Sequence, residues 1–118
     1  MAELSISELM QRQAALYEKH RQDWDPRDPE HGKDSLLWMV DELGEVIAII
    51  KKKGPDAIME DAHVRAHYVE ECSDVFMYFL DMLQCYGIGA EEFTTAFDKK
   101  WHRNMNRTWE ENNAMYED

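Results

Sequence analysis

Apolar residues recur every three or four positions along most of the chain, a period typical of amphipathic α-helices. Clusters of Pro, Gly and charged residues interrupt this pattern in three places, so the sequence predicts four main helices. These helices are expected to cover about residues 5–24, 34–53, 63–86 and 90–108. Because no segment alternates as a half-buried strand would, we predict an all-α fold.

Residues that favour helix ends support these boundaries. Ser5 and Glu8 have the spacing of a capping box at the start of the first helix. Asp34 or Ser35 can cap the second helix, which should stop at residue 53, before a Gly-Pro pair. Gly87 is expected to end the third helix.

The two longer connections have different expected roles. Residues 23–33 contain two prolines, a glycine and alternating charges, which predicts a loop. Loops of about ten residues in small helical domains are often functional, so this one is a candidate substrate lid. Residues 55–62 are expected to form only a short turn or partial helix.

The second helix has one apolar face and two acids beside it. A stripe that steps by four and three residues predicts a core face formed by Leu36, Val40, Leu43, Ile47 and Ile50. The lysines at 51 and 52 fall on the opposite side, where solvated charges belong. Glu42 and Glu45 lie elsewhere, on a half-apolar flank beside Trp38 and Ile49. Their position on the helix indicates a role other than solubility.

The third helix is apolar nearly all round between residues 75 and 83, where Asp81 is its one charge. Such a helix is expected in the middle of a domain. Glu71 and Asp74 share one of its faces with Tyr78, and a buried pair of carboxylates needs a positive partner. Asp81 is expected to support that site or to lie at a contact between subunits.

The fourth helix is expected to pack through Phe93, Phe97 and Trp101. Flanking this aromatic face are Lys100, Asn104 and Arg107 at helical spacing. These three side chains are candidate phosphate-binding groups. Their alternative role is to offset the helix dipole at a C-terminal turn.

Composition narrows the class of protein. The chain has 118 residues, of which 44% are hydrophobic and 32% charged, which suits one soluble domain. A net charge of −12 argues against binding to nucleic acid or to an anionic membrane. No signal-peptide pattern and no apolar stretch of about 18 residues occur. Cys72 and Cys85 are expected to be reduced core thiols, so we expect a cytoplasmic protein.

The two acidic pairs suggest a reaction. Glu42 with Glu45, and Glu71 with Asp74, each have i, i+3 spacing, which places both members on one helix face. Two antiparallel helices can bring these pairs together as a cup of oxygen ligands, the kind that Mg²⁺ prefers. With cationic and polar groups further along the chain to hold phosphates, the parts suit hydrolysis of a phosphoanhydride.

Three motifs follow one another in the order DELGEV, EECSDVFMYFL and K-x-x-x-N-x-x-R, at residues 41–46, 70–80 and 100–107. Together they resemble the all-α nucleoside triphosphate pyrophosphohydrolase superfamily. That superfamily includes MazG-like proteins, dimeric dUTPases, dCTP pyrophosphatases and phosphoribosyl-ATP pyrophosphatase. The resemblance covers about residues 20–107. It implies one MazG-like helical bundle over residues 1–108, followed by an acidic tail at 109–118, that assembles as a homodimer or homotetramer.

The same resemblance implies a function and a set of site residues. The function is Mg²⁺-dependent cleavage of a (d)NTP to the monophosphate and pyrophosphate, with Mn²⁺ as a substitute, in house-cleaning or in balancing nucleotide pools. The implied metal ligands are Glu42, Glu45, Glu71 and Asp74, with Glu45 also the candidate general base. A further likeness to dCTP-pyrophosphatase-like proteins over residues 23–45 makes Trp24, His31 and Trp38 candidates for a base pocket. On this basis we expect substrates such as dCTP or dUTP.

Other interpretations of these residues remain. Glu42 and Glu45 could be a surface pair, and Glu71 and Asp74 could be acids in the first turns of a helix that face its dipole. The tryptophans could be ordinary core aromatics.

Glu60 and His63 have the E-x-x-H spacing of a di-iron bundle, although such a site needs two of these motifs. Phosphoribosyl-ATP hydrolysis is an alternative activity. A helical interaction module that has lost activity is an alternative class, and the presence of all four acids argues against it.

Overall fold

The computed structural model describes residues 2–107, which are helical and contain no strand. The structure confirms the predicted all-α class. Its elements, listed in chain order, are α1 (Ile6–His20), the 3₁₀ turn η1 (Pro29–His31), α2 (Gly32–Glu60), α3 (Ala62–Cys85) and α4 (Ala90–Met105).

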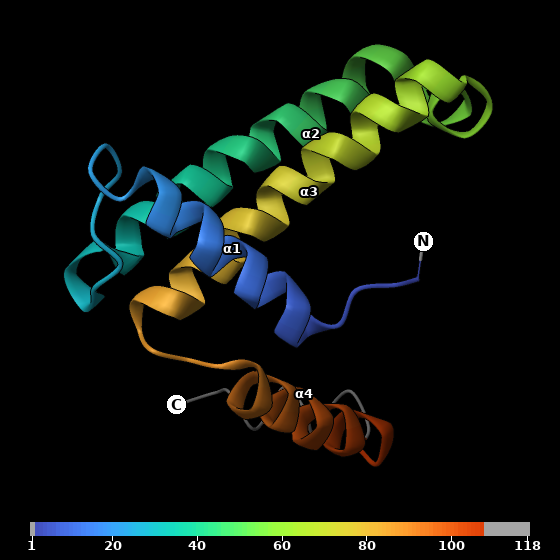
Figure 1. Cartoon of the computed structure of the whole chain (residues 1–118). Helices are drawn as coiled ribbons and strands as arrows, with labels where there is room; N and C mark the ends of the chain where they lie inside the picture. The colour runs from blue at the N-terminus through green and yellow to red at the C-terminus, as the bar shows by residue number, and fades with distance from the viewer. Residues whose placement is uncertain (1, 108–118) are drawn as a thin grey trace.

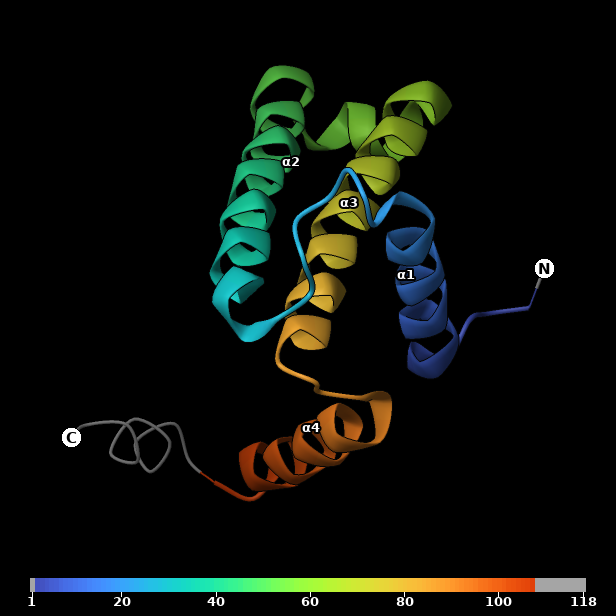
Figure 2. The same cartoon turned by 60° about the vertical axis from the view of Figure 1, so that its left-hand side comes forward.

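A long hairpin formed by α2 and α3 is the framework of the molecule. These two helices make the largest interface of the fold and run side by side in opposite directions (Figure 1). The first helix, α1, packs across α3. The last helix, α4, packs against α1 and lies beyond the C-terminal end of α3 (Figure 2). The middle of the hairpin is therefore left open on one side.

The predicted break near residue 54 is present as a sharp kink. Gly54 has a φ of +82°, a conformation that glycine adopts at no steric cost, and Pro55 starts the next turns of α2. Residues 55–60 are helical, as the expectation of a partial helix allowed. The Asp61 side chain then caps α3 by accepting hydrogen bonds from the backbone N–H groups of His63 and Val64.

The expected helix ends on both sides of the first loop are wrong. The capping box of Ser5 and Glu8 is confirmed, but α1 ends at His20 rather than Trp24. The second helix begins at Gly32, because Asp28 caps η1 and this turn continues directly into α2. The candidate caps at 34 and 35 therefore lie inside the first turn of α2.

The beginning of α2 is fixed against the end of α3. Gly32 is buried, and the Tyr86 ring lies so close to its backbone that a Cβ atom there would collide with the ring. Ser35, three residues later, is also buried, as is Cys85 near the end of α3. The turn η1, which precedes Gly32, also contacts α3.

The core of the described residues is small: three of its buried apolar residues belong to the last part of α3, and a fourth lies in the second half of α2. Its buried apolar residues are Ile49, Leu80, Leu83 and Cys85. The predicted core stripe of α2 is wrong for the single chain, because α3 packs against the flank that carries Glu42 and Ile49. The stripe instead faces outward, with 38–55% exposure at Leu36, Val40, Leu43, Ile47 and Ile50.

Two other burial predictions are also wrong for the single chain. Only the C-terminal part of α3 is buried, so Cys72 in its exposed part is not a core thiol. On α4, Phe93 packs edge-on against Phe79, whereas Phe97 and Trp101 are 65% and 49% exposed. The radius of gyration is 17.3 Å, against about 13–14 Å expected for a compact domain of this length. Apolar faces of α2, α3 and α4 thus remain uncovered within one chain.

The fourth helix was expected to end at Thr108, but α4 ends three residues earlier, at Met105, with Asn106 as its C-cap. The expected tail at 109–118 lies outside the described residues. Among the helices described, none has the length and apolar character needed to cross a membrane.

Candidate active site

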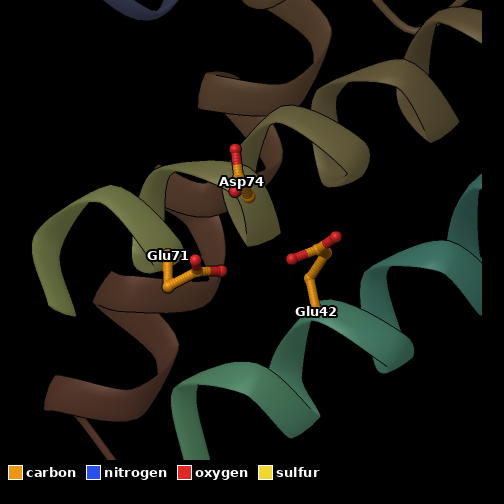
Figure 3. A group of neighbouring side chains, drawn as sticks. All are labelled: Glu42, Glu71 and Asp74. Atoms are coloured by element: carbon orange, nitrogen blue, oxygen red, sulfur yellow. The ribbon is translucent and has the colours of Figure 1, made fainter. Parts of the chain in front are cut away.

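Three of the four predicted metal ligands meet between α2 and α3. Glu42 projects from α2 toward Glu71 and Asp74 on α3 (Figure 3). One carboxylate oxygen from each lies within 4.8 Å of the others, and all three residues are half-buried. Glu71 and Asp74 face Glu42 together because three residues of helix return a side chain to nearly the same face. The antiparallel hairpin thus brings together three of the four acids of the predicted cup.

This cluster carries an excess of negative charge. Burial raises the pKa of Glu42, and the nearby carboxylates of Asp74 and Glu71 raise it further. Within the described residues, the ion pair that reaches the cluster joins His67 Nε2 to Glu71 Oε1 at 3.3 Å. That imidazole is 57% exposed, and it compensates the cluster only when protonated. A divalent cation would supply the missing charge, and the all-oxygen ligand set suits a hard ion.

Glu45 occupies a different position from the other three acids. It is exposed, one turn after Glu42 on α2, and it is not part of the group within 4.8 Å. Its side chain borders a cavity of about 310 Å³ that His63 and His67 also line. Its roles as fourth ligand and general base therefore stay predictions.

The predicted phosphate-binding residues lie on another part of the fold. Lys100 and Asn104 belong to α4, and Arg107 follows it. Both views place α4 beyond the end of α3, away from the middle of the hairpin where the acidic cluster lies (Figures 1 and 2). A single chain does not bring these three residues to the carboxylates.

The three predicted base-pocket residues do come together. Trp24, His31 and Trp38 line one cavity of about 350 Å³, formed by α1, the loop after it, the start of α2 and the last part of α3. Asp74 of the acidic cluster also lines this cavity. The cavity and the cluster are therefore continuous, which neither motif alone could predict.

A buried polar group formed by Asp81, Gln13 and Arg27 is part of the wall of this cavity, and of these three residues the sequence singled out only Asp81. Asp81 is 4% exposed. Its Oδ1 accepts a hydrogen bond of 3.0 Å from Gln13 Nε2, and its Oδ2 pairs with an Arg27 terminal nitrogen at 3.2 Å. The Arg27 guanidinium lies 4.7 Å from the Tyr17 ring centroid and 5.9 Å from that of Trp24. The ion pair thus ties the loop to α3.

The signals for this group were weak in the sequence. Asp81 stood out as the one charge in an apolar stretch of helix, which indicates a buried acid with a specific partner. Nothing in the pattern marks Gln13, a polar residue on the buried side of α1, or Arg27, one charge among many in the loop. Their roles depend on how α1 crosses α3.

At the edge of the cavity, a second pair orders the loop. Asp28 Oδ1 lies 2.6 Å from His31 Nδ1, and this contact raises the pKa of the imidazole and lowers that of the carboxyl. The Asp28 carboxylate also accepts from the His31 backbone N–H. His31 is therefore held in one orientation beside the cavity.

The di-iron alternative finds no support in the fold. Glu60 ends α2 and His63 lies in the first turn of α3, with Asp61 between the two helices. The two side chains are both exposed and do not share a helix face. The spacing that motivated this alternative is therefore interrupted by a helix boundary.

A family model described as dATP/dGTP pyrophosphohydrolase matches residues 38–117, which is more than half of the chain. The matched segment contains both acidic motifs, Trp38 and Asp81, and it begins after the loop. Neither the curated proteins nor the solved structures gave a match. With the all-helical fold and its acidic cup, this match shows that the chain belongs to the dATP/dGTP pyrophosphohydrolase family of the all-α, MazG-like superfamily, hydrolases that act on nucleoside triphosphates.

Proposed function

We propose that this chain cleaves a purine deoxynucleoside triphosphate to the monophosphate and pyrophosphate at the acidic cluster between α2 and α3. The observation that carries this proposal is the continuity of two sites. A cavity bordered by aromatic rings, of a size that suits a nucleoside, is lined by Asp74, which is also one of three clustered carboxylates suited to a phosphate-bound cation.

In this proposal Glu42, Glu71 and Asp74 hold Mg²⁺, with Mn²⁺ as a substitute. The donor set consists of carboxylate oxygens at mutual distances that one ion can bridge, and the raised pKa of Glu42 indicates uncompensated charge there. When bound, the ion supplies charge neutralisation for the phosphate oxygens during cleavage. The residues present therefore fit the metal that the superfamily resemblance implies.

Glu45 is the proposed general base. It is solvent-exposed, one turn along α2 from the cluster, where it can reach a water molecule beside the bound phosphates. The water oxygen bonds to a phosphorus atom of the α–β bridge, Glu45 takes the proton, and the bridging P–O bond breaks. The products are the nucleoside monophosphate and pyrophosphate. Its alternative role as the fourth metal ligand would require its side chain to join the other three carboxylates when the ion binds.

The phosphate-binding role of Lys100, Asn104 and Arg107 requires a second subunit. Because α4 lies away from the acidic cluster within one chain, these groups would act on the cluster of a neighbouring copy. The outward apolar stripe of α2 and the exposed Phe97 and Trp101 of α4 supply surface for that assembly. We therefore propose a homodimer or homotetramer.

The substrate follows from the family description. That description names purine deoxynucleotides, whereas the loop motif led us to expect dCTP or dUTP. We propose dATP and dGTP as the substrates, so that the activity lowers or balances the purine part of the deoxynucleotide pool in the cytoplasm.

The test is pyrophosphate release from a panel of the four dNTPs and four NTPs, with and without Mg²⁺. We expect release from dATP or dGTP with the ion and none after chelation. Asp74→Asn and Glu45→Gln should each lower kcat by about 10²–10⁴-fold, the usual contribution of a general base or of metal-assisted chemistry.

Asp41→Asn is the matched control, because Asp41 is an exposed acid next to Glu42 that does not belong to the cluster. It should keep nearly full activity. If the folded wild-type chain releases no pyrophosphate from any nucleotide in the panel, the proposed function is wrong.

A further inference from the structure

The burial of a charged side chain such as Asp81 in a small helical fold has an unfavourable desolvation free energy. Its side chain is 6% exposed, and that of its partner Arg27 is 11% exposed. Replacing a buried ion pair with apolar side chains of similar size is often neutral or stabilising, so stability alone does not require this pair. Burial also raises the pKa of Asp81, while Gln13 and Arg27 oppose that effect by stabilising the ionised form.

The position of Asp81 relative to the acidic cluster matches the length of a nucleotide. Asp74 and Asp81 are separated by seven residues, which is two turns or about 10 Å along α3. Both line the same cavity, and Tyr78 lines it between them. A nucleotide whose phosphates lie at Asp74 would therefore extend along α3 and bring the far edge of its base to Asp81.

The aromatic rings of the cavity leave the base edge to be recognised by Asp81. Trp24 and Trp38 border the cavity from the loop and from α2, where they can cover the faces of a purine ring. Stacking of this kind accepts any base, because every base has an apolar face. Discrimination between bases must then come from polar groups in the cavity wall, among which Asp81 is the buried acid.

We propose that Asp81 is the specificity-determining residue of this site and that it selects guanine by accepting hydrogen bonds from the N1–H and 2-amino groups. This inference rests on the proposed function. An ionised carboxylate offers about four acceptor positions, and the bonds from Gln13 and Arg27 use two of them. Both oxygens therefore keep acceptor capacity for a ligand.

Guanine is the base that matches a carboxylate. Its N1–H and 2-amino groups are adjacent donors, so they can form two parallel charge-assisted bonds with one carboxylate. Adenine places the unprotonated N1 beside its 6-amino group, and that lone pair meets a carboxylate oxygen unfavourably. Cytosine has the same donor–acceptor order as adenine, and it is also too short to reach from the phosphates to Asp81.

The experiment compares kcat/KM for dGTP, dITP and dATP on the full chain with Mg²⁺. Inosine keeps N1–H but lacks the 2-amino group. For the wild type we expect dGTP to exceed dITP by about 10-fold, because dITP loses one charge-assisted bond. It should exceed dATP by about 10–100-fold, because a good bidentate pair discriminates between bases by that much. This comparison needs no variant and so cannot fail through misfolding.

The Asp81→Asn variant then tests whether Asp81 causes the preference for dGTP over dATP. It should lower the dGTP-to-dATP ratio by at least 10-fold. Trp38→Ala, a comparison variant in the stacking wall, should lower kcat/KM for all three nucleotides by the same factor and leave the ratio unchanged.

Two results would overturn the inference while leaving the proposed function intact. One is equal kcat/KM for dGTP and dATP in the wild type. The other is an Asp81→Asn variant that lowers activity on both nucleotides equally, which would mean that Asp81 only ties the loop to α3. Absence of pyrophosphate release from every nucleotide would instead contradict the proposed function.

Discussion

The two acidic sites on α3 lie two turns apart and are built in opposite ways. Asp81 is buried and has both carboxylate oxygens bonded by groups of its own chain, Gln13 and Arg27. Glu71 and Asp74 are half-buried and face a third carboxylate, Glu42, with an exposed imidazole as the described basic neighbour. The negative charge of Asp81 is therefore compensated by groups of the same chain, whereas the negative charge of the cluster is compensated much less.

This difference shows what each site can do. A carboxylate fixed by its own partners is rigid and presents a constant hydrogen-bonding pattern, as recognition of a base requires. A carboxylate cluster without enough internal compensation is poised to gain free energy from an added cation. The cavity that connects the two lets one ligand use both.

The largest expected effect that separates the two sites is on stability. Asp81→Ala leaves the guanidinium of Arg27 buried without its partner, and breaking a buried pair in this way costs about 3–5 kcal/mol. Asp74→Ala, seven residues earlier on the same helix, removes one of three mutually repelling acids and should cost less than about 1 kcal/mol. Urea unfolding at pH 7 without metal and at one fixed chain concentration measures both.

A double variant tests whether the stability lost by Asp81→Ala comes from the unpaired charge of Arg27. Arg27→Met combined with Asp81→Leu replaces both charges by apolar side chains and should recover most of the stability lost by Asp81→Ala. Equal losses for Asp81→Ala and Asp74→Ala would contradict the contrast between a compensated and an uncompensated site.

A smaller effect is expected from neutralising the open cluster. Because burial and the neighbouring carboxylates raise the pKa of Glu42, its charged form is disfavoured in the metal-free fold. Glu42→Gln should therefore raise the Tm of the metal-free chain, by an amount worth a few tenths to about 1 kcal/mol for partly exposed charges. The same variant should lose most of the Tm increase that Mg²⁺ gives to the wild type.

Asp41→Asn is the control for this measurement as well, because Asp41 is exposed and lies outside the cluster. It should change the Tm of the metal-free chain less than Glu42→Gln does. A metal-free Glu42→Gln variant less stable than the wild type would show that the cluster is compensated by the protein itself.

The sequence predicted the acidic cup better than it predicted the core. Helical spacing placed Glu42 on a half-apolar flank and Glu71 with Asp74 on one face, and the α2–α3 hairpin brings these faces together. The relative direction of two side chains on one helix depends only on their spacing, so it does not change with the packing of the rest of the chain.

Burial depends on which face meets a partner, and that information is not local. The apolar stripe of α2, which includes Val40 and Ile47, is outward in the single chain because α3 packs on the neighbouring flank. The sequence did not predict the roles of Gln13 and Arg27, because these two residues contact Asp81 only through the tertiary packing of α1 and the loop on α3. Periodicity identifies an apolar face but does not identify what covers it.

The last expected effect is the pH dependence of metal binding. The pKa of Glu42 is raised above its usual value of 4.5, so its protonated form persists to higher pH than in an unfolded chain. The metal-free fold should therefore lose stability as pH rises from about 4.5 through the raised pKa, because the disfavoured charge then forms. Mg²⁺ requires the deprotonated carboxylate, so its stabilisation should grow across the same interval and level off above it.

The measurement is the difference in Tm with and without Mg²⁺ between pH 4.5 and 8. Taking the difference removes most of the contribution of the Asp28–His31 pair, which titrates in both samples. In that pair the raised pKa of His31 gives stability that is lost as pH rises, and the lowered pKa of Asp28 gives stability that is lost as pH falls.

At 100 times its Kd, Mg²⁺ should add about 2.7 kcal/mol to the free energy of unfolding at the upper plateau. A Glu42→Gln chain should show a smaller and flatter difference, because the group whose proton competes with the ion is gone. A wild-type difference that is constant from pH 4.5 to 8 would mean that the ion binds away from Glu42, and the uncompensated cluster would then need another explanation.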